Sequence, residues 1–268
     1  MEAAWGGLID RWEDYLRATG SPRTTIGLRT YHLRRLAADF PGGPRSVTLQ
    51  TLVKWLAGQD WAPNTRRAYR GSLRSFWSWA MITGVVSSSP AHLLPPVAVP
   101  RARPRPTPEQ AYRMALRVAD DRERLAILLA GQCGLRRGEI AQVRREDVEA
   151  DLLGHSLRVA GKGGVVRLVP LPEGLAATIL AHPAGWLFPS SHGGHLTPHH
   201  LGKVISRCLP EGLTTHTLRH RCATVAYAQT RDLRAVQELL GHAKPETTAM
   251  YTAVPDGAVR AAMAAAAA

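Results

Sequence analysis

Residues 239–251 read Leu-Leu-Gly-His-Ala-Lys-Pro-Glu-Thr-Thr-Ala-Met-Tyr. In this stretch a histidine, His242, stands nine residues before a tyrosine, Tyr251. A histidine can donate a hydrogen bond to a phosphate, and a tyrosine hydroxyl can act as a nucleophile. We therefore take Tyr251 as the candidate nucleophile and residues 239–251 as a candidate active-site segment.

Two upstream motifs supply the positive charge that phosphodiester chemistry requires. They are Gly134-Leu-Arg-Arg-Gly-Glu139 and His216-Thr-Leu-Arg-His220. Cleavage without a metal ion needs donors on the non-bridging phosphate oxygens, a nucleophile and an acid for the leaving oxygen. Arg136 and Arg219 fit the first role, because a guanidinium binds two oxygens at once and stays charged. His216 lies three residues before Arg219, so it falls on the same helix face and can donate to the phosphate or accept the tyrosine proton.

The candidate general acid is Lys162, which lies in the glycine-rich run 161–164 between two short predicted strands, 156–160 and 165–169. A lysine there could protonate the departing 5′-oxygen, and the glycines leave the turn free to move over DNA. We give Glu139 a supporting role that orients an arginine. His220 either forms a hydrogen bond within the site or fills the core, and we favour the core.

Together these motifs resemble the tyrosine recombinase, or phage integrase, family over residues 131–253, in its short form without the arm-binding domain of larger integrases. Lys162 matches the family's hairpin lysine. Arg137-Gly138 and Arg221 depart from the usual pattern without removing a reacting group. The resemblance implies a helical core-binding domain, a catalytic domain and the catalytic set Arg136, Lys162, His216, Arg219, His242 and Tyr251.

The resemblance also implies a function. A family member binds two double-stranded DNA sites as a homotetramer, nicks each strand through a 3′-phosphotyrosine, exchanges strands through a Holliday junction and rejoins them, with no cofactor. Three alternatives remain: a type IB-like topoisomerase that relaxes DNA, a DNA-binding protein with an idle site, and an RNA-binding protein. The last is disfavoured because no RNP-type aromatic motif is present. The target sequence and any accessory factors do not follow from the sequence.

Composition agrees with a nucleic-acid partner. The 268 residues carry 34 Lys and Arg against 21 Asp and Glu, a net charge of +13. A chain this basic is expected to bind a polyanion. Three cysteines are too few for a disulfide framework, and no stretch of 18 apolar residues exists. We therefore expect a bacterial or phage-encoded protein of the cytoplasm, associated with the nucleoid and not with a membrane.

Hydrophobic periodicity predicts a mainly α fold with a small antiparallel β-hairpin or sheet. Residues 1–95 read as four helices, the third capped by Thr48, and form a core-type DNA-binding domain. Residues 96–107 form a proline-rich basic linker, and residues 108–268 a catalytic domain. Its expected helices lie near 108–119 and 122–132, after Arg136, and near 173–182, 197–208, 216–229, 232–241 and 245–254. The candidate DNA-binding arginines are Arg66, Arg70 and Arg74 on the fourth helix and Arg101, Arg103 and Arg105 in the linker.

One segment raises the question of a metal site. Residues 191–200 contain four histidines, at 192, 195, 199 and 200. Histidine is a common zinc ligand, but no cysteine or carboxylate lies among them, and the chemistry proposed above needs no ion. We therefore expect a loop and helix start near DNA and no metal ion.

Overall fold

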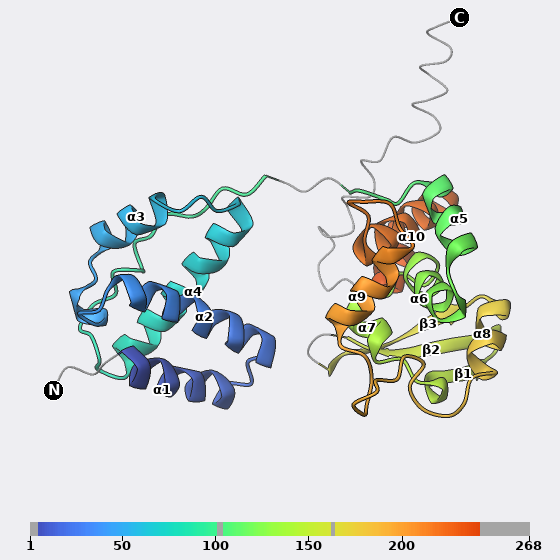
Figure 1. Cartoon of the computed structure of the whole chain (residues 1–268), viewed down its shortest axis with the longest axis horizontal. Coiled ribbons are helices and arrows are strands. Elements are labelled where there is room, and N and C mark those ends of the chain that lie inside the picture. Colours follow the sequence, from blue (N-terminus) through green and yellow to red (C-terminus); the bar gives the residue numbers. More distant parts are fainter. Residues whose placement is uncertain (1–4, 101–103, 162–163, 242–268) are drawn as a thin grey trace, which may run out of the picture. The chain divides into compact units, whose positions relative to one another are not determined.

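The computed structural model describes residues 5–100, 104–161 and 164–241 (Figure 1). The chain divides into two compact units, Met1–Arg101 and Ala102–Ala268. Five of the predicted site residues and one predicted helix lie outside the described residues: Arg101, Arg103, Lys162, His242, Tyr251 and the helix at 245–254.

The first unit is helical, with α1 (Trp5–Ala18), α2 (Arg23–Asp39), α3 (Leu49–Ala57) and α4 (Pro63–Ile82), and a short 3-10 turn at Pro44–Ser46. The four predicted helices are confirmed. So is the Thr48 cap, whose side chain accepts a hydrogen bond from the backbone N–H of Thr51. Each helix contributes an apolar face to one core that is rich in aromatic side chains, among them Trp12, Tyr69, Phe76 and Trp77.

Two of the α4 arginines brace loops of the first unit. The Nη2 of Arg66 donates to the carbonyl of Gln59 at 2.9 Å. Arg70 donates to the carbonyl of Leu94 through Nε at 3.0 Å and Nη2 at 2.8 Å. Two of the three candidate DNA-binding arginines of α4 therefore hold loops of the first unit in place, a role that was not predicted from the sequence.

A buried histidine lies in the aromatic part of this core. The Nδ1 of His32 is 2.9 Å from the hydroxyl of Ser72, and its ring stacks on Tyr69 with centroids 3.7 Å apart. On the other side Tyr69 stacks on Trp61 at 3.8 Å. Burial lowers the pKa of His32 to about 4, so the ring is neutral at neutral pH.

This burial predicts that the protein loses stability in mild acid. The pKa of His32 falls from 6.5 to about 4 on folding, so between these pH values the unfolded chain binds a proton that the folded chain does not. The stabilising effect of neutral His32 is complete above pH 6.5 and is lost as the pH falls to about 4, a change of about 3 kcal/mol. Thermal unfolding of wild type and His32→Asn at several pH values measures it. The variant should show a shallower pH dependence, and His92→Asn, at an exposed position, should not.

The second unit joins a three-stranded sheet to helices. It begins with α5 (Glu109–Val118), α6 (Asp121–Gly131) and α7 (Arg137–Ala141), followed by a 3-10 turn at Arg145–Asp147. The strands β1 (Val148–Asp151), β2 (Gly154–Ala160) and β3 (Val166–Leu171) then form an antiparallel sheet in that order. In the register Leu157 pairs with Val148 on one side and Val169 on the other. The predicted hairpin is confirmed, and β1 is an addition to it.

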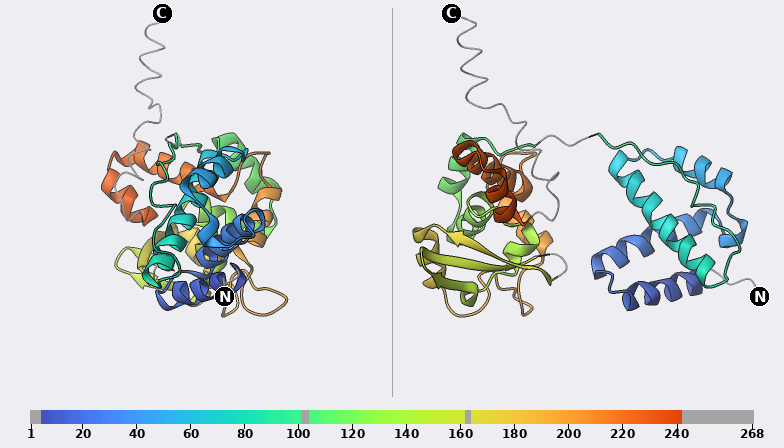
Figure 2. Two further views of the ribbon diagram at one scale, coloured as in Figure 1. Left: turned by 90° about the vertical axis from the view of Figure 1, so that its left-hand side faces the viewer. Right: turned by 180° about the vertical axis from the view of Figure 1, so that it is seen from behind.

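The remaining helices complete the second unit: α8 (Glu173–Leu180), α9 (Pro198–Arg207), α10 (Thr215–Thr230) and α11 (Leu233–Leu240). The sheet lies at one end of the unit and α10 at the other (Figures 1 and 2). Between them is a core that includes Leu129, Leu135, Leu157, Phe188 and Leu218. The predicted mainly α fold with a small antiparallel sheet is confirmed. Among the described helices, none is long and apolar enough to cross a membrane.

Candidate active site

Glu139 is the centre of the site. It lies in the first turn of α7 and is only 8% exposed. One carboxylate oxygen accepts from the backbone N–H of Arg136 at 2.8 Å, and the other from Arg136 Nη1 at 2.7 Å. The carboxylate therefore caps the start of the helix, where the N–H groups lack intrahelical partners, and also fixes the Arg136 side chain.

Two more arginines approach the same carboxylate. Arg167, on β3, donates Nη1 and Nη2 to the two Glu139 oxygens at 3.1 and 3.0 Å. Arg219, on α10, has Nη1 3.9 Å from Glu139 Oε2. Burial of the carboxyl opposes its ionisation, but the hydrogen bonds from Arg167 and from the Arg136 backbone outweigh burial and hold the pKa of Glu139 below its ordinary value. The predicted orienting role of Glu139 thus extends to an arginine that the sequence analysis did not name.

The same three arginines hold the end of α11. Arg167 Nε donates to the carbonyl of Leu239 at 3.2 Å, Arg219 Nη2 to Leu240 at 2.7 Å, and Arg136 Nη2 to Gly241 at 3.3 Å. The last carbonyls of a helix have no intrahelical partner and carry a partial negative charge, which cations stabilise. The end of α11 and Gly241, which precede His242 in the sequence, therefore lie against the candidate phosphate-binding residues Arg136 and Arg219.

His216 and His220 form a pair on α10. Their Nε2 atoms are 2.9 Å apart, and their rings meet edge to face. Burial, His216 and Arg219 lower the pKa of His220 to about 4. Partial burial and the charges of Arg219 and Arg136 also lower the pKa of His216. Both rings are therefore neutral at neutral pH, and one Nε2–H donates to the other nitrogen. His220 is buried, as predicted, and it also contacts the site.

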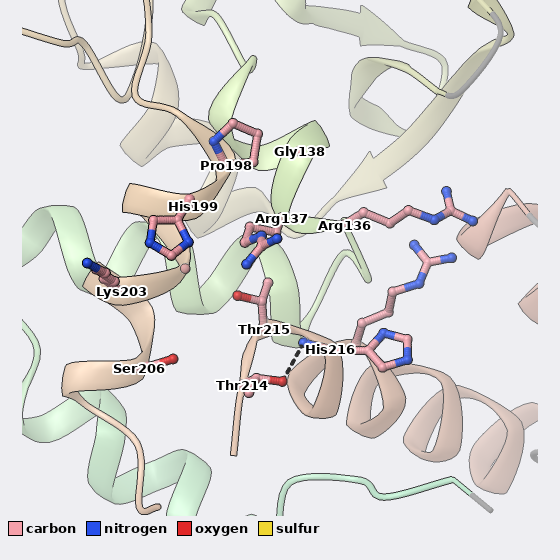
Figure 3. Close-up of a pocket in the computed structure, with 12 residues that line it drawn as sticks. Arg136, Arg137, Gly138, Pro198, His199, Lys203, Ser206, Thr214, Thr215 and His216 are labelled. Atoms are coloured by element: carbon pink, nitrogen blue, oxygen red, sulfur yellow. Dashed lines mark hydrogen bonds between the residues drawn. The ribbon is translucent and has the colours of Figure 1, made fainter. Parts of the chain in front are cut away.

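A hollow of about 660 Å³ opens beside these residues, and the charged and histidine side chains of its lining are Arg136, Arg137, His199, Lys203, His216 and Arg219. Figure 3 shows that the neighbouring arginines 136 and 137 point in different directions. A Cβ atom at Gly202 would be 2.8 Å from Arg137 Cδ, so the glycine leaves room for this arginine. None of the residues that line the hollow is acidic. Its charge suits a phosphate backbone.

Gly134 allows the close packing behind Arg219. Its φ is +64°, and a Cβ atom there would lie 2.7 Å from Leu240 Cδ2 and 3.2 Å from Cys222 Sγ. Its carbonyl accepts from Arg219 Nη1. Gly134 therefore couples the start of the first motif to α10 and α11.

We predict that Gly134→Ala destabilises the second unit. A side chain in the left-handed region costs about 1–3 kcal/mol, and the contact with Leu240 adds to this cost. The unfolding midpoint in urea, compared with wild type, measures the change. Gly174→Ala is the matched control, because that helical glycine has nothing within 4 Å of a new Cβ, and it should be neutral or stabilising. An unchanged midpoint for Gly134→Ala would contradict the prediction.

Two other features of the sequence have structural explanations. Arg221, a departure from the family pattern, donates to Glu109 at 2.9 and 2.7 Å and to the Gly131 carbonyl at 3.0 Å, and lies 3.8 Å from the Tyr112 ring centroid. It joins α10 to α5 and α6.

In the histidine-rich segment, His195 Nδ1 is 2.8 Å from the Leu196 carbonyl. Within the part of the chain that the structure describes, no group of three potential metal-ligating side chains comes together.

Comparison with known proteins decides the family. The model of the phage integrase family matches residues 107–257. This chain belongs to the phage integrase family. A tyrosine recombinase XerC from Rhodospirillum centenum is 36% identical over 93% of this chain and 81% of its own length. A tyrosine recombinase XerD from Pseudomonas putida is 29% identical over 87% of this chain and 85% of its own.

Solved structures show the same fold. A lambda integrase dimer bound to a COC′ core site matches 93% of this chain and 77% of its own, with a TM-score of 0.74 and 18% identity. XerH bound to difH in a pre-cleavage complex matches 95% and 84%, with a TM-score of 0.67 and 20% identity. The sequence prediction of a tyrosine recombinase is confirmed, and this phage integrase family member is a site-specific DNA recombinase.

The structure brings five of the predicted site residues together: Arg136, Glu139, His216, Arg219 and His220. Four further residues that were not predicted from the sequence lie at the site: Arg137, His199 and Lys203 line the hollow, and Arg167 binds Glu139. Arg137 was within a quoted motif, and the histidine-rich segment pointed to His199. No local signal marks Arg167, because its partners are 28 and 72 residues away along the chain.

Proposed function

We propose that this recombinase cuts and rejoins duplex DNA through a 3′-phosphotyrosine at Tyr251, and that four protomers exchange strands between two sites through a Holliday junction. The observation that carries the proposal is that Arg136, Arg219 and His216 line one hollow, whose lining contains no acidic residue. A lambda integrase tetramer bound to a Holliday junction, with a TM-score of 0.73 and 20% identity over 91% of this chain and 78% of its own, supports the fold needed for such an assembly.

The two arginines would bind the scissile phosphate. Arg136 is 43% exposed in its side chain and Arg219 only 3%, so Arg136 reaches out from the rim while Arg219 donates from the floor. Preorganised donors of this kind stabilise the charge that grows on the phosphate oxygens in the transition state. On binding DNA, the guanidinium groups of Arg136 and Arg219 would replace some of their hydrogen bonds to backbone carbonyls with hydrogen bonds to phosphate oxygens.

The proposed cleavage step moves two protons. The phenolic oxygen of Tyr251 would form a bond to phosphorus while the bond from phosphorus to the 5′-oxygen breaks. Neutral His216 has a lone pair that can accept the phenolic proton, and Lys162 would protonate the 5′-oxygen. His242 would donate a further hydrogen bond to the phosphate. Rejoining is the reverse, with a 5′-hydroxyl as the attacking group.

We propose that both units bind DNA. In the catalytic unit Arg137, His199 and Lys203 would contact the backbone beside the scissile phosphate. In the first unit, proposed as residues 1–95, the contacts would come from Arg66, Arg70 and Arg74, and in the linker at 96–107 from Arg101, Arg103 and Arg105. The division of the chain between Arg101 and Ala102 falls within that linker and supports these boundaries. A DNA substrate would place the protein at the bacterial nucleoid.

Covalent trapping tests the proposal. The protein is incubated in EDTA with nicked suicide duplexes made from fragments of source-genome DNA, and adducts are sought after denaturation. An adduct that forms without metal and maps to Tyr251 supports the proposal. Binding without an adduct points to an idle site. Relaxation of supercoiled plasmid without synapsis of two sites would point to a topoisomerase instead.

A further inference from the structure

Arg167 is the most enclosed cation of the site apart from Arg219, among the residues described. It lies on β3, and its side chain is 13% exposed. All three of its nitrogens are engaged: Nη1 and Nη2 bind the two oxygens of Glu139, and Nε binds the carbonyl of Leu239. Arg167 therefore faces other parts of the site and not the hollow, whose lining does not include it.

Its two sets of contacts reach two different parts of the catalytic machinery. Through Glu139 it shares a carboxylate with Arg136, whose Nη1 lies 2.7 Å from the same oxygen that Arg167 Nη1 approaches at 3.1 Å. Through Leu239 it holds the end of α11. Arg136 is half exposed and depends on few contacts, so the position of the Glu139 carboxylate sets the direction of its guanidinium.

The glycine of the Leu-Gly-His motif allows this packing. Gly241 has φ +62°, and a Cβ atom there would lie 2.8 Å from Arg167 Cδ and 3.0 Å from its Nε. A side chain at 241 would therefore displace Arg167. This contact ties the backbone that leads into the segment of His242 and Tyr251 to β3.

We propose that Arg167 is a positioning residue for recombination. By holding Glu139 it aims Arg136 at the scissile phosphate, and by holding Leu239 it places the end of α11 from which the chain continues to the nucleophile. This inference rests on the proposed function. It goes beyond the proposed function because it assigns a role to Arg167, a side chain that would contact neither DNA nor the reacting atoms.

Lysine cannot reproduce these contacts. Its single nitrogen keeps the charge but loses the fork and the Nε donor. We expect Arg167→Lys to lower the single-turnover cleavage rate at saturating DNA by roughly 10- to 100-fold, because small misplacements of catalytic groups have effects of that size. The dissociation constant for DNA should change less than about threefold, since no phosphate contact is lost.

A leaving-group substitution separates this role from an effect on the neighbouring hairpin lysine. A 5′-bridging phosphorothiolate needs no protonation on departure, so it should restore cleavage by Lys162→Ala. The cleavage rate of Arg167→Lys should be reduced by the same factor relative to wild type on both substrates, because Arg167 acts on the groups that bind the phosphate and place the nucleophile. Restoration of Arg167→Lys by the phosphorothiolate would overturn the proposal and assign the residue to the hairpin.

Two further variants complete the test. Glu139→Gln combined with Arg167→Lys should cleave little more slowly than the slower single variant, because the two side chains act as one unit. Arg158→Lys, on the neighbouring strand, is the control and should cleave at the wild-type rate, since its partners are Asp147 and Glu149. Rates are expressed per folded protein, from the unfolding curve of each variant.

The outcomes are distinct. Wild-type cleavage by folded Arg167→Lys would overturn this inference and leave the proposed function intact. Fully multiplicative losses in the double variant would also overturn it. If wild type forms no adduct, the proposed function fails and this inference fails with it.

Discussion

Tyr251→Phe should form no detectable covalent adduct with DNA. Phenylalanine lacks the oxygen that would bond to phosphorus, and no neighbouring group in the proposed mechanism replaces it. Binding to duplex DNA should persist, because the cationic residues of both units are unchanged. Nicked suicide duplexes followed by a denaturing gel measure the adduct, and a mobility shift under the same conditions measures binding.

A tyrosine elsewhere in the catalytic unit provides the control. Tyr227 lies on α10, partly buried beside the small cluster of Ala223, Val236 and Leu240. Tyr227→Phe keeps the ring and should form the adduct at the wild-type rate. An adduct that survives Tyr251→Phe, or that maps to another residue, would contradict the assignment of the nucleophile.

Arg136→Ala should lower the cleavage rate on the order of 10²–10³-fold, as does the loss of one preorganised donor to a developing oxyanion. DNA affinity should change much less. Arg136 tests phosphate binding more cleanly than Arg219 does. The Arg136 side chain is at the rim of the site, and without it Glu139 keeps its contacts with Arg167. Arg219→Ala would also remove buried hydrogen bonds to Gly134 and Leu240 and so destabilise the fold.

The adjacent arginine gives the opposite pattern. Arg137 points away from Arg136 into the hollow (Figure 3). Arg137→Ala should weaken binding across DNA sequences and reduce the salt dependence by about one phosphate contact, with the rate at saturating DNA kept. Single-turnover rates against DNA concentration, at several salt concentrations, distinguish the two variants. An equal loss of affinity and rate in Arg136→Ala would contradict its assignment to the scissile phosphate.

Most elements of the fold could be predicted because their signals are local. The described helices follow the spacing of their apolar residues, and Thr48 marks a start by bonding to a residue three positions on. The strand β1 was missed for the opposite reason. Of its four residues only Val148 is even partly buried, so no alternation is visible, and pairing with β2 holds it in place.

The chemistry of the site was also readable from the sequence. The order of arginine, histidine, lysine and tyrosine residues indicates which reactions are chemically available. Charge, hydrogen-bond donors and nucleophilic oxygen are properties of the individual side chains. This order resembles that of the phage integrase family, and the resemblance implies the recombinase function. The chemical type of each reacting group depends only on the identity of its residue, so it can be predicted from the sequence alone.

The contacts that each arginine makes are determined by the tertiary structure. In the sequence the motifs mark Arg136 and Arg219, but nothing local distinguishes what Arg137 and Arg167 contact. Folding brings Arg167 to Glu139, leaves Arg137 in the hollow and uses Arg66 and Arg70 to brace loops. A side chain's role depends on its burial and its partners. Those partners come from distant segments that hydrophobic packing brings together, and no local pattern in the sequence records them.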